Sequence, residues 1–158
     1  MDLGTVAGLP THVLLVHIAL SIVPLAAFLS VLSAVWPAAR KRLGIVTPIA
    51  AIGALAVVVV TGFAGQWLLA HVRTTPLIEV HAALGPTLEP WSIALAGLCV
   101  GQWVWINYLR RRIPTRFWLA ISVAIAIAVI VVATASVVKV VQIGEAGSRA
   151  IWQGSYIP

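Results

Sequence analysis

The sequence predicts an all-α integral membrane protein, a four-helix bundle that crosses the bilayer four times. Hydrophobic residues make up 61% of the 158 residues and charged residues only 9%. The mean hydropathy is +1.07, far above the range of soluble domains. Four stretches are long enough to cross a hydrocarbon core, which takes about 20 helical residues. Each stretch is apolar throughout, without the alternation of a strand, so we expect helices.

The four spans are expected, in order, at about residues 13–36, 47–69, 88–108 and 117–138. The loops between them are short, so consecutive helices should be antiparallel neighbours in an up-down-up-down bundle. Few residues remain outside these spans and loops to form a second domain. We therefore expect a single membrane domain that covers residues 1–158.

The segment after the last span, 140–158, is too polar to cross the bilayer and too short to fold alone. Gly144 and Gly147 predict a turn in this tail. Such a turn would fold Arg149 and Trp152 back across the mouth of the bundle, or toward a partner. The alternative is an interfacial tail anchored by its aromatic residues.

The basic residues predict the orientation in the membrane, because loops rich in arginine and lysine stay in the cytoplasm. They gather in the first and third loops, at Arg40, Lys41, Arg42, Arg110, Arg111, Arg112 and Arg116. Both termini and the tail should then be extracytoplasmic. A composition rich in arginine, alanine and valine suggests a bacterial inner (cytoplasmic) membrane. The basic loops that orient the chain during membrane insertion account for most of the net charge of +6. We therefore expect no nucleic acid as a partner.

All four histidines fall at the extracytoplasmic end of this layout. His17 reaches the outer boundary of the first span, and His12 lies between one and two turns beyond it. His71 lies about one turn beyond the second span, and His81 precedes the third. Neutral imidazole can ligate iron, copper or zinc, so this layer is a candidate metal site.

A single haem b bound by two histidines fits such a bundle best, because its axial ligands must come from different helices at similar heights. The candidate pairs are His17 with His81 and His71 with His81. His12 and His17 are five residues apart and point about 140° away from each other, so we do not expect both to ligate one iron. Arg73 and Arg149 are candidates to neutralise the haem propionates.

Two other interpretations of the histidine layer remain open. Copper or zinc could bind there, although no cysteine lies at that face and no His-x-x-x-His pair gives preorganised spacing. Alternatively, the imidazoles bind no cofactor and only form hydrogen bonds at a wet interface. Glu89, which opens the third span, is either a partner for a ligating histidine or a carboxylate at a helix N-terminus.

Four motifs spread over the chain resemble a bacterial family of four-helix membrane proteins, domain of unknown function 2231. They are LPTHVLLVHIAL at 9–20, VTGFAGQW at 60–67, HAALG at 81–85 and IGEAGSRAIW at 143–152. Some relatives are joined to Rieske-type or cytochrome c-type domains, so the resemblance implies that this protein works together with redox proteins. His17 and His81 lie at family-like positions.

These observations predict a membrane redox subunit that binds one haem b near the extracytoplasmic face and transfers electrons within a larger membrane complex. We expect no enzymatic activity from the chain alone. The competing hypothesis is a non-catalytic accessory subunit of a respiratory-type complex, or of a homo-oligomer, that packs through small-residue helix faces. A transporter is disfavoured, because the polar residues of the spans form no evident path through the midplane.

Overall fold

The computed structural model describes residues 4–109, 112 and 114–153. Arg110 and Arg111 of the expected cytoplasmic loop, and residues 154–158 of the expected tail, lie outside the described residues. A two-stranded antiparallel hairpin, β1 (Thr5–Val6) and β2 (Leu9–Pro10), precedes the helices. The backbone N–H of Thr11 donates to the carbonyl of Gly4 at 3.2 Å. This bond ties the hairpin to the first turn of the first helix.

Helices account for nearly all of the remaining described chain. They are α1 (Thr11–Val35), α2 (Pro37–Leu43), α3 (Val46–Leu69), α4 (Pro76–Leu84), the 3-10 turn η1 (Gly85–Leu88), α5 (Glu89–Val104), the π-helical turn η2 (Trp105–Leu109) and α6 (Thr115–Trp152). Within the described residues, four helices are long and apolar enough to cross a membrane. The predicted class, an all-α membrane protein with four apolar spanning helices, is therefore confirmed.

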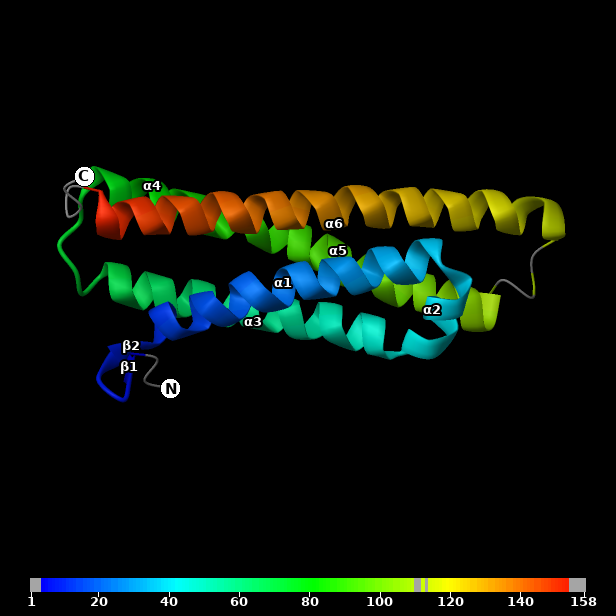
Figure 1. Cartoon of the computed structure of the whole chain (residues 1–158), viewed down its shortest axis with the longest axis horizontal. Coiled ribbons are helices and arrows are strands. Elements are labelled where there is room, and N and C mark those ends of the chain that lie inside the picture. Colours follow the sequence, from blue (N-terminus) through cyan, green and yellow to red (C-terminus); the bar gives the residue numbers. More distant parts are fainter. Residues whose placement is uncertain (1–3, 110–111, 113, 154–158) are drawn as a thin grey trace.

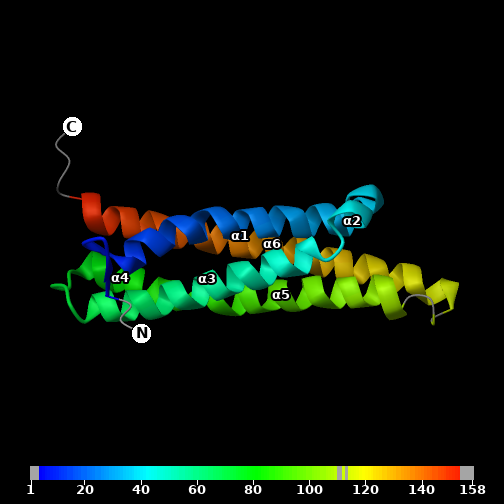
Figure 2. The ribbon, with the colours of Figure 1, turned by 90° about the horizontal axis from the view of Figure 1, so that it is seen from below.

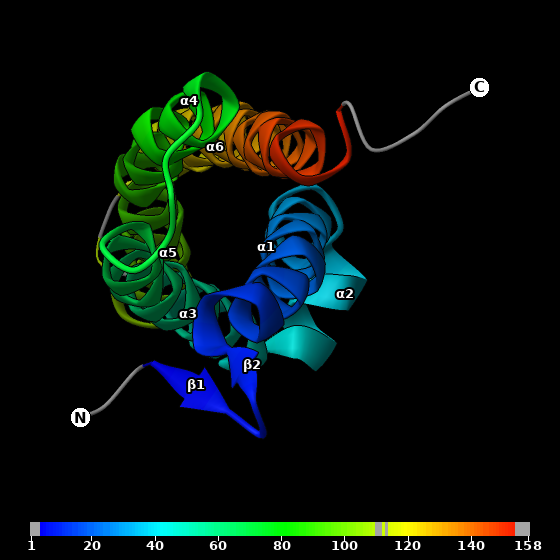
Figure 3. The ribbon, with the colours of Figure 1, turned by 90° about the vertical axis from the view of Figure 1, so that its left-hand side faces the viewer.

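The spanning helices form a ring in which each packs against the helix before it and the helix after it. α1 lies against α3 and α6, and α5 lies against α3 and α6 from the other side. Figure 1 shows that neighbours run in opposite directions, as expected from the short loops. Figures 2 and 3 show that α6 closes the ring against α1. The start of α1 and the ends of α3 and α6 therefore meet at one end, which we call the histidine end.

The third span is longer than the sequence predicted. It runs from Pro76 to Leu109 rather than over about 88–108, because α4, η1 and α5 follow one another without a break. Thr75 starts the segment by accepting a hydrogen bond from the backbone N–H of Ile78 at 3.3 Å, and Pro76 occupies the first turn, where its missing N–H costs nothing. Pro86, in the 3-10 turn, interrupts the α-helical geometry without ending the segment.

The predicted turn at Gly144 and Gly147 is wrong, because both glycines lie inside the unbroken helix α6. At 1.5 Å per residue α6 is about 57 Å long, well beyond the roughly 30 Å of a hydrocarbon core. Its final turns are stabilised by α4, which packs against α6. The polar end of the chain therefore has a helical partner, which its composition alone could not reveal.

Small residues predominate in the interior of the bundle, and many large apolar residues cover its outside. Alanines on α1, α3, α5 and α6, together with Ser30 and Cys99, form the buried contacts. Phe28, Phe63 and Ile127 are exposed on the outer surface. This distribution suits a membrane helix bundle, in which close backbone approach replaces a hydrophobic drive between helices.

Candidate histidine site

His12 and His81 meet at the histidine end of the bundle. His12 lies in the first turn of α1, and His81 lies in α4. Their ring centres are 6.1 Å apart and the ring planes are inclined by 70°, so the two imidazoles meet edge to face rather than stack. Both residues are half-buried. The fold thus joins two residues that stand at the beginning of two different spanning segments.

Each of these rings is anchored by a backbone carbonyl of a different helix. Nδ1 of His12 lies 3.0 Å from the carbonyl oxygen of Thr61 on α3. Nδ1 of His81 lies 3.0 Å from the carbonyl oxygen of Ile143 on α6. A carbonyl only accepts hydrogen bonds, so Nδ1 carries the proton in each neutral ring and Nε2 keeps its lone pair. Both rings therefore have the tautomer that can ligate a metal through Nε2.

A glycine of the facing helix lies against each ring. The Cε1 and Nδ1 atoms of His12 lie beside Gly65, and those of His81 lie beside Gly147. Nearby, the Thr11 hydroxyl is buried and finds no hydrogen-bond partner among the described residues. A polar group bound at this end of the bundle would give that hydroxyl a partner.

His17 and His71 have a different environment, because both are exposed and, within the described part of the chain, each bonds to its own helical segment. Nδ1 of His17 lies 2.7 Å from the carbonyl of Val13, and Nδ1 of His71 lies 2.7 Å from the carbonyl of Trp67. His71 also stacks on Trp67, with ring centres 4.0 Å apart. These are local, i to i−4 contacts, and neither brings a second spanning helix to the imidazole.

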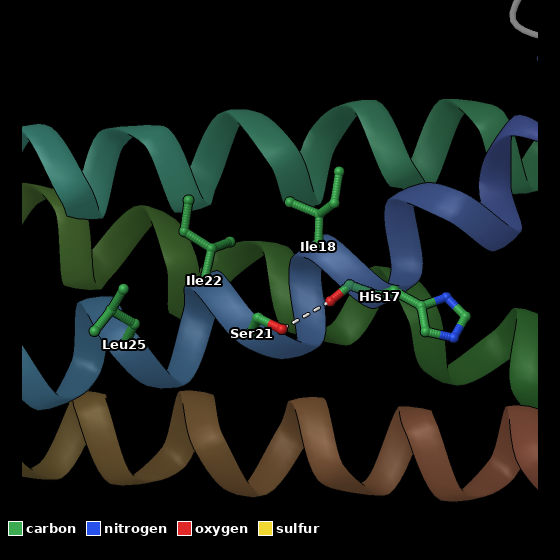
Figure 4. A pocket seen from close by; sticks show the side chains of 5 residues that line it. All are labelled: His17, Ile18, Ser21, Ile22 and Leu25. Atoms are coloured by element: carbon green, nitrogen blue, oxygen red, sulfur yellow. Dashed lines mark hydrogen bonds between the residues drawn. The ribbon is translucent and has the colours of Figure 1, made fainter.

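His17 borders a shallow pocket on the outer side of α1. The pocket has a volume of about 390 Å³ and is lined by His17, Ile18, Ser21, Ile22 and Leu25, all from α1 (Figure 4). Ile18 and Leu25 are about half exposed, so this face of α1 is directed toward lipid. The pocket is apolar and distinct from the contact between His12 and His81.

The structure therefore brings together a different pair from the two that the sequence favoured. His81 meets His12, whereas His17 and His71 lie exposed. The physical reason is the rotational phase of α1: with His12 turned inward, a residue five positions later points about 140° away from it. The sequence predicted that angular separation, but not which of the two histidines faces the interior.

The other candidate residues lie at or near the surface. Arg149 is exposed and forms an ion pair with Glu145 at 2.6 Å, one turn earlier on α6. Arg73 is exposed in the connection between α3 and α4. Glu89 is the exposed first residue of α5. It directly follows the 3-10 turn, inside the continuous segment Pro76–Leu109, so it does not stand at a free helix N-terminus.

A metal ion held by protein ligands alone usually needs three or four of them. No group of three or more His, Cys, Asp or Glu side chains is placed to hold a metal ion in the part of the chain that the structure describes. The metal-capable side chains that meet at the histidine end are thus two imidazoles.

The fold and this site define a class, a helical multi-pass membrane protein with two facing imidazoles at one end of its bundle. Comparison with family models, with curated proteins and with solved structures gave no match for the chain.

Proposed function

We propose that this chain is a membrane redox subunit in which His12 and His81 would hold one haem b, and which transfers electrons within a larger assembly. The observation that carries the proposal is the facing pair of imidazoles, each with Nδ1 bonded to a carbonyl, which leaves Nε2 as the unprotonated nitrogen of the neutral ring. When bound, the haem iron would take up and release one electron. The side chains would hold and orient the iron.

The two rings lie close enough together to hold the same bound group. The ring centres of His12 and His81 are 6.1 Å apart. The two ligands also come from different spanning segments, α1 and α4, as a haem inserted between helices requires.

The number of ligands also favours a haem over a bare ion. A porphyrin supplies nitrogen ligands of its own, so a haem would need only His12 and His81 from the protein. Zinc in a structural site takes four protein ligands, and catalytic zinc takes three plus water. The pair formed by His12 and His81 would leave zinc or copper(II) dependent on water or other added ligands.

The hydrogen bonds to the backbone support a ligating role. A histidine that binds a metal usually donates its other ring N–H to a carboxylate, a carbonyl or water, which sets the tautomer and makes the ligating nitrogen more basic. The carbonyls of Thr61 and Ile143 are the acceptors here. Because they belong to α3 and α6, all four spanning segments would contribute to the site.

The basic loops provide the orientation for this proposal. Arg40, Lys41 and Arg42 lie at the end opposite to the histidine pair, in and beside α2. If these residues stay in the cytoplasm, the haem lies near the extracytoplasmic face of the inner membrane. Electron donor and acceptor would then approach from that face or from within the membrane.

An absorption spectrum of the detergent-purified protein, oxidised and then reduced with dithionite, tests the proposal when combined with metal analysis. We expect sharp reduced α and β bands and about one iron per chain. A colourless sample that contains stoichiometric copper or zinc would indicate a bare-ion site. A colourless, metal-free sample that also takes up no added haemin would overturn the proposal and favour the accessory-subunit hypothesis.

A further inference from the structure

We infer that Gly65 and Gly147 are positioning residues that hold the His12 and His81 rings against the backbones of α3 and α6, with Nδ1 on a carbonyl and Nε2 unprotonated. This inference deepens the proposed function. Only its consequence for haem binding rests on that function, because the placement of the rings is a property of the protein itself.

Gly65 lets the ring of His12 reach the backbone of α3. A Cβ atom added at Gly65 would lie 2.9 Å from Cε1 and 3.0 Å from Nδ1 of His12. Contacts that short require the ring to move. The hydrogen bond from Nδ1 to the Thr61 carbonyl, 3.0 Å long, also requires the ring to lie close to the α3 backbone. A side chain at position 65 would therefore disturb the position of the ring and this hydrogen bond.

Gly147 does the same for His81 on α6. A Cβ atom there would lie 3.0 Å from Cε1 and 3.1 Å from Nδ1 of His81, and Nδ1 is 3.0 Å from the Ile143 carbonyl. In both cases the acceptor carbonyl belongs to the residue four positions before the glycine. The two rings thus use the same arrangement on two different helices, which points to a common role for the two glycines.

Other glycines in these helices lack such a neighbour. In α3, an added Cβ would meet nothing within 4 Å at Gly53 or at Gly62, which is one turn from Gly65. In α6, an added Cβ at Gly144 would lie 3.0 Å from Cδ2 of Leu20, an aliphatic side chain rather than an imidazole. Glycine in a helix interior is less favourable than alanine. Gly65 and Gly147 are therefore explained by the close approach of an imidazole, and Gly62 provides a matched control.

The final turns of α6 become part of the histidine site in this view. They contribute the Ile143 carbonyl and the Gly147 surface on which His81 rests. α4 is held to the bundle largely through α6. The orientation of one imidazole therefore depends on a segment whose composition alone suggests a peripheral tail.

The test is ¹⁵N NMR of histidine-labelled apoprotein in detergent micelles, with the four imidazoles assigned by single His→Gln variants. In the wild type we expect all four rings to carry the proton on Nδ1. The Nδ1 protons of half-buried His12 and His81 should exchange with solvent more slowly than those of exposed His17 and His71. Equal exchange at all four rings would overturn the inference without any glycine variant.

The glycine variants then separate the two positions. G65A should change the Nδ1 and Nε2 shifts of His12 most, and G147A should change those of His81 most. G62A should leave all four rings as in the wild type, and His17 and His71 serve as internal references throughout. Unchanged signals of His12 in G65A and of His81 in G147A would contradict a positioning role.

Haem titration of the same samples measures how the position of the two rings affects haem binding. Loss of an orienting hydrogen bond around a metal ligand lowers affinity by about 10–100-fold, so G65A and G147A should bind haem that much more weakly than G62A. If the NMR changes occur but the wild type takes up no haem, the positioning role stands and the proposed function fails. If the wild type binds haem and both variants bind equally well, the two glycines do not position the ligands.

Discussion

The imidazoles of His12 and His81 meet edge to face, with ring centres 6.1 Å apart, although one lies at the start of the first spanning segment and the other near the start of the third. Each is held by a carbonyl of yet another helix. The arrangement of the two imidazoles therefore depends on the whole ring of helices.

The first prediction concerns the ligand pair. H12A and H81A should each lose most of the reduced α band expected of the proposed haem, because each variant removes one of the two proposed ligands. H17A and H71A should retain that band, since both side chains are exposed and, within the described residues, bond to their own segment. Reduced-minus-oxidised spectra at equal protein concentration provide the measurement.

The opposite pattern would be equally informative. If H12A kept full haem occupancy and H17A lost it, the ligand pair would be His17 with His81, as the sequence favoured. Size-exclusion profiles of the four variants in detergent control for loss of fold.

The second prediction concerns the contact between α1 and α5. Ser30 is 0% exposed and Cys99 is 1% exposed. The Ser30 Oγ lies 3.0 Å from the Cys99 Sγ and 2.6 Å from the carbonyl oxygen of Ala26, to which it donates. S30L should lower the free energy of unfolding by about 1–3 kcal/mol through overpacking, whereas S30A should cost only about 0.6 kcal/mol, a typical membrane hydrogen bond.

Denaturant unfolding in mixed micelles provides this comparison. S21L is the matched control on the same helix, because Ser21 makes a similar bond to the His17 carbonyl but is exposed. A cost of S21L equal to that of S30L would show that the effect does not come from the buried contact.

The third prediction concerns the end of α1 opposite to the histidines. Arg40 donates from Nε to the carbonyl of Ser33 at 2.7 Å and from its guanidinium to the carbonyl of Ala34. These carbonyls lie in the last turn of α1, where no helical N–H follows to satisfy them. R40A should therefore destabilise the protein by about 1.5–3 kcal/mol, the range for hydrogen bonds to charged groups.

Arg42 offers the control for that substitution, because it lies in the same short helix and is exposed. R42A should change stability by less than about 0.5 kcal/mol. Thermal unfolding of both variants against the wild type measures the difference, and equal midpoints for R40A and R42A would refute a capping role.

The fourth prediction concerns orientation in the membrane. In a C99A background, a T74C variant should react with a membrane-impermeant maleimide on intact cells, and a K41C variant should react only after permeabilisation. The reason is that basic loops stay in the cytoplasm, and Lys41 and Thr74 lie exposed at opposite ends of the bundle. Labelling of K41C alone on intact cells would place the histidine end in the cytoplasm.

The first two spans were predicted closely, and the last two were not. The spans expected at about 13–36 and 47–69 correspond to the helices Thr11–Val35 and Val46–Leu69. They were predictable because lipid requires a continuous apolar helix, which hydropathy can detect. The third and fourth spanning helices extend well past the predicted limits at the histidine end. Their extra turns are polar enough to escape hydropathy, and α4 and α6 stabilise them by packing against each other.

The amino-acid sequence by itself determined the class of the protein, the number of spanning helices, and the gathering of four histidines toward one end. These follow from apolar length and from position along each segment, which are properties of one helix at a time. Only the tertiary structure decided that His12 and His81 meet, that His17 and His71 face outward, and that α6 continues through Gly144 and Gly147. Those outcomes depend on the rotation of each helix about its own axis and on contacts between helices distant in sequence, such as His81 on Gly147.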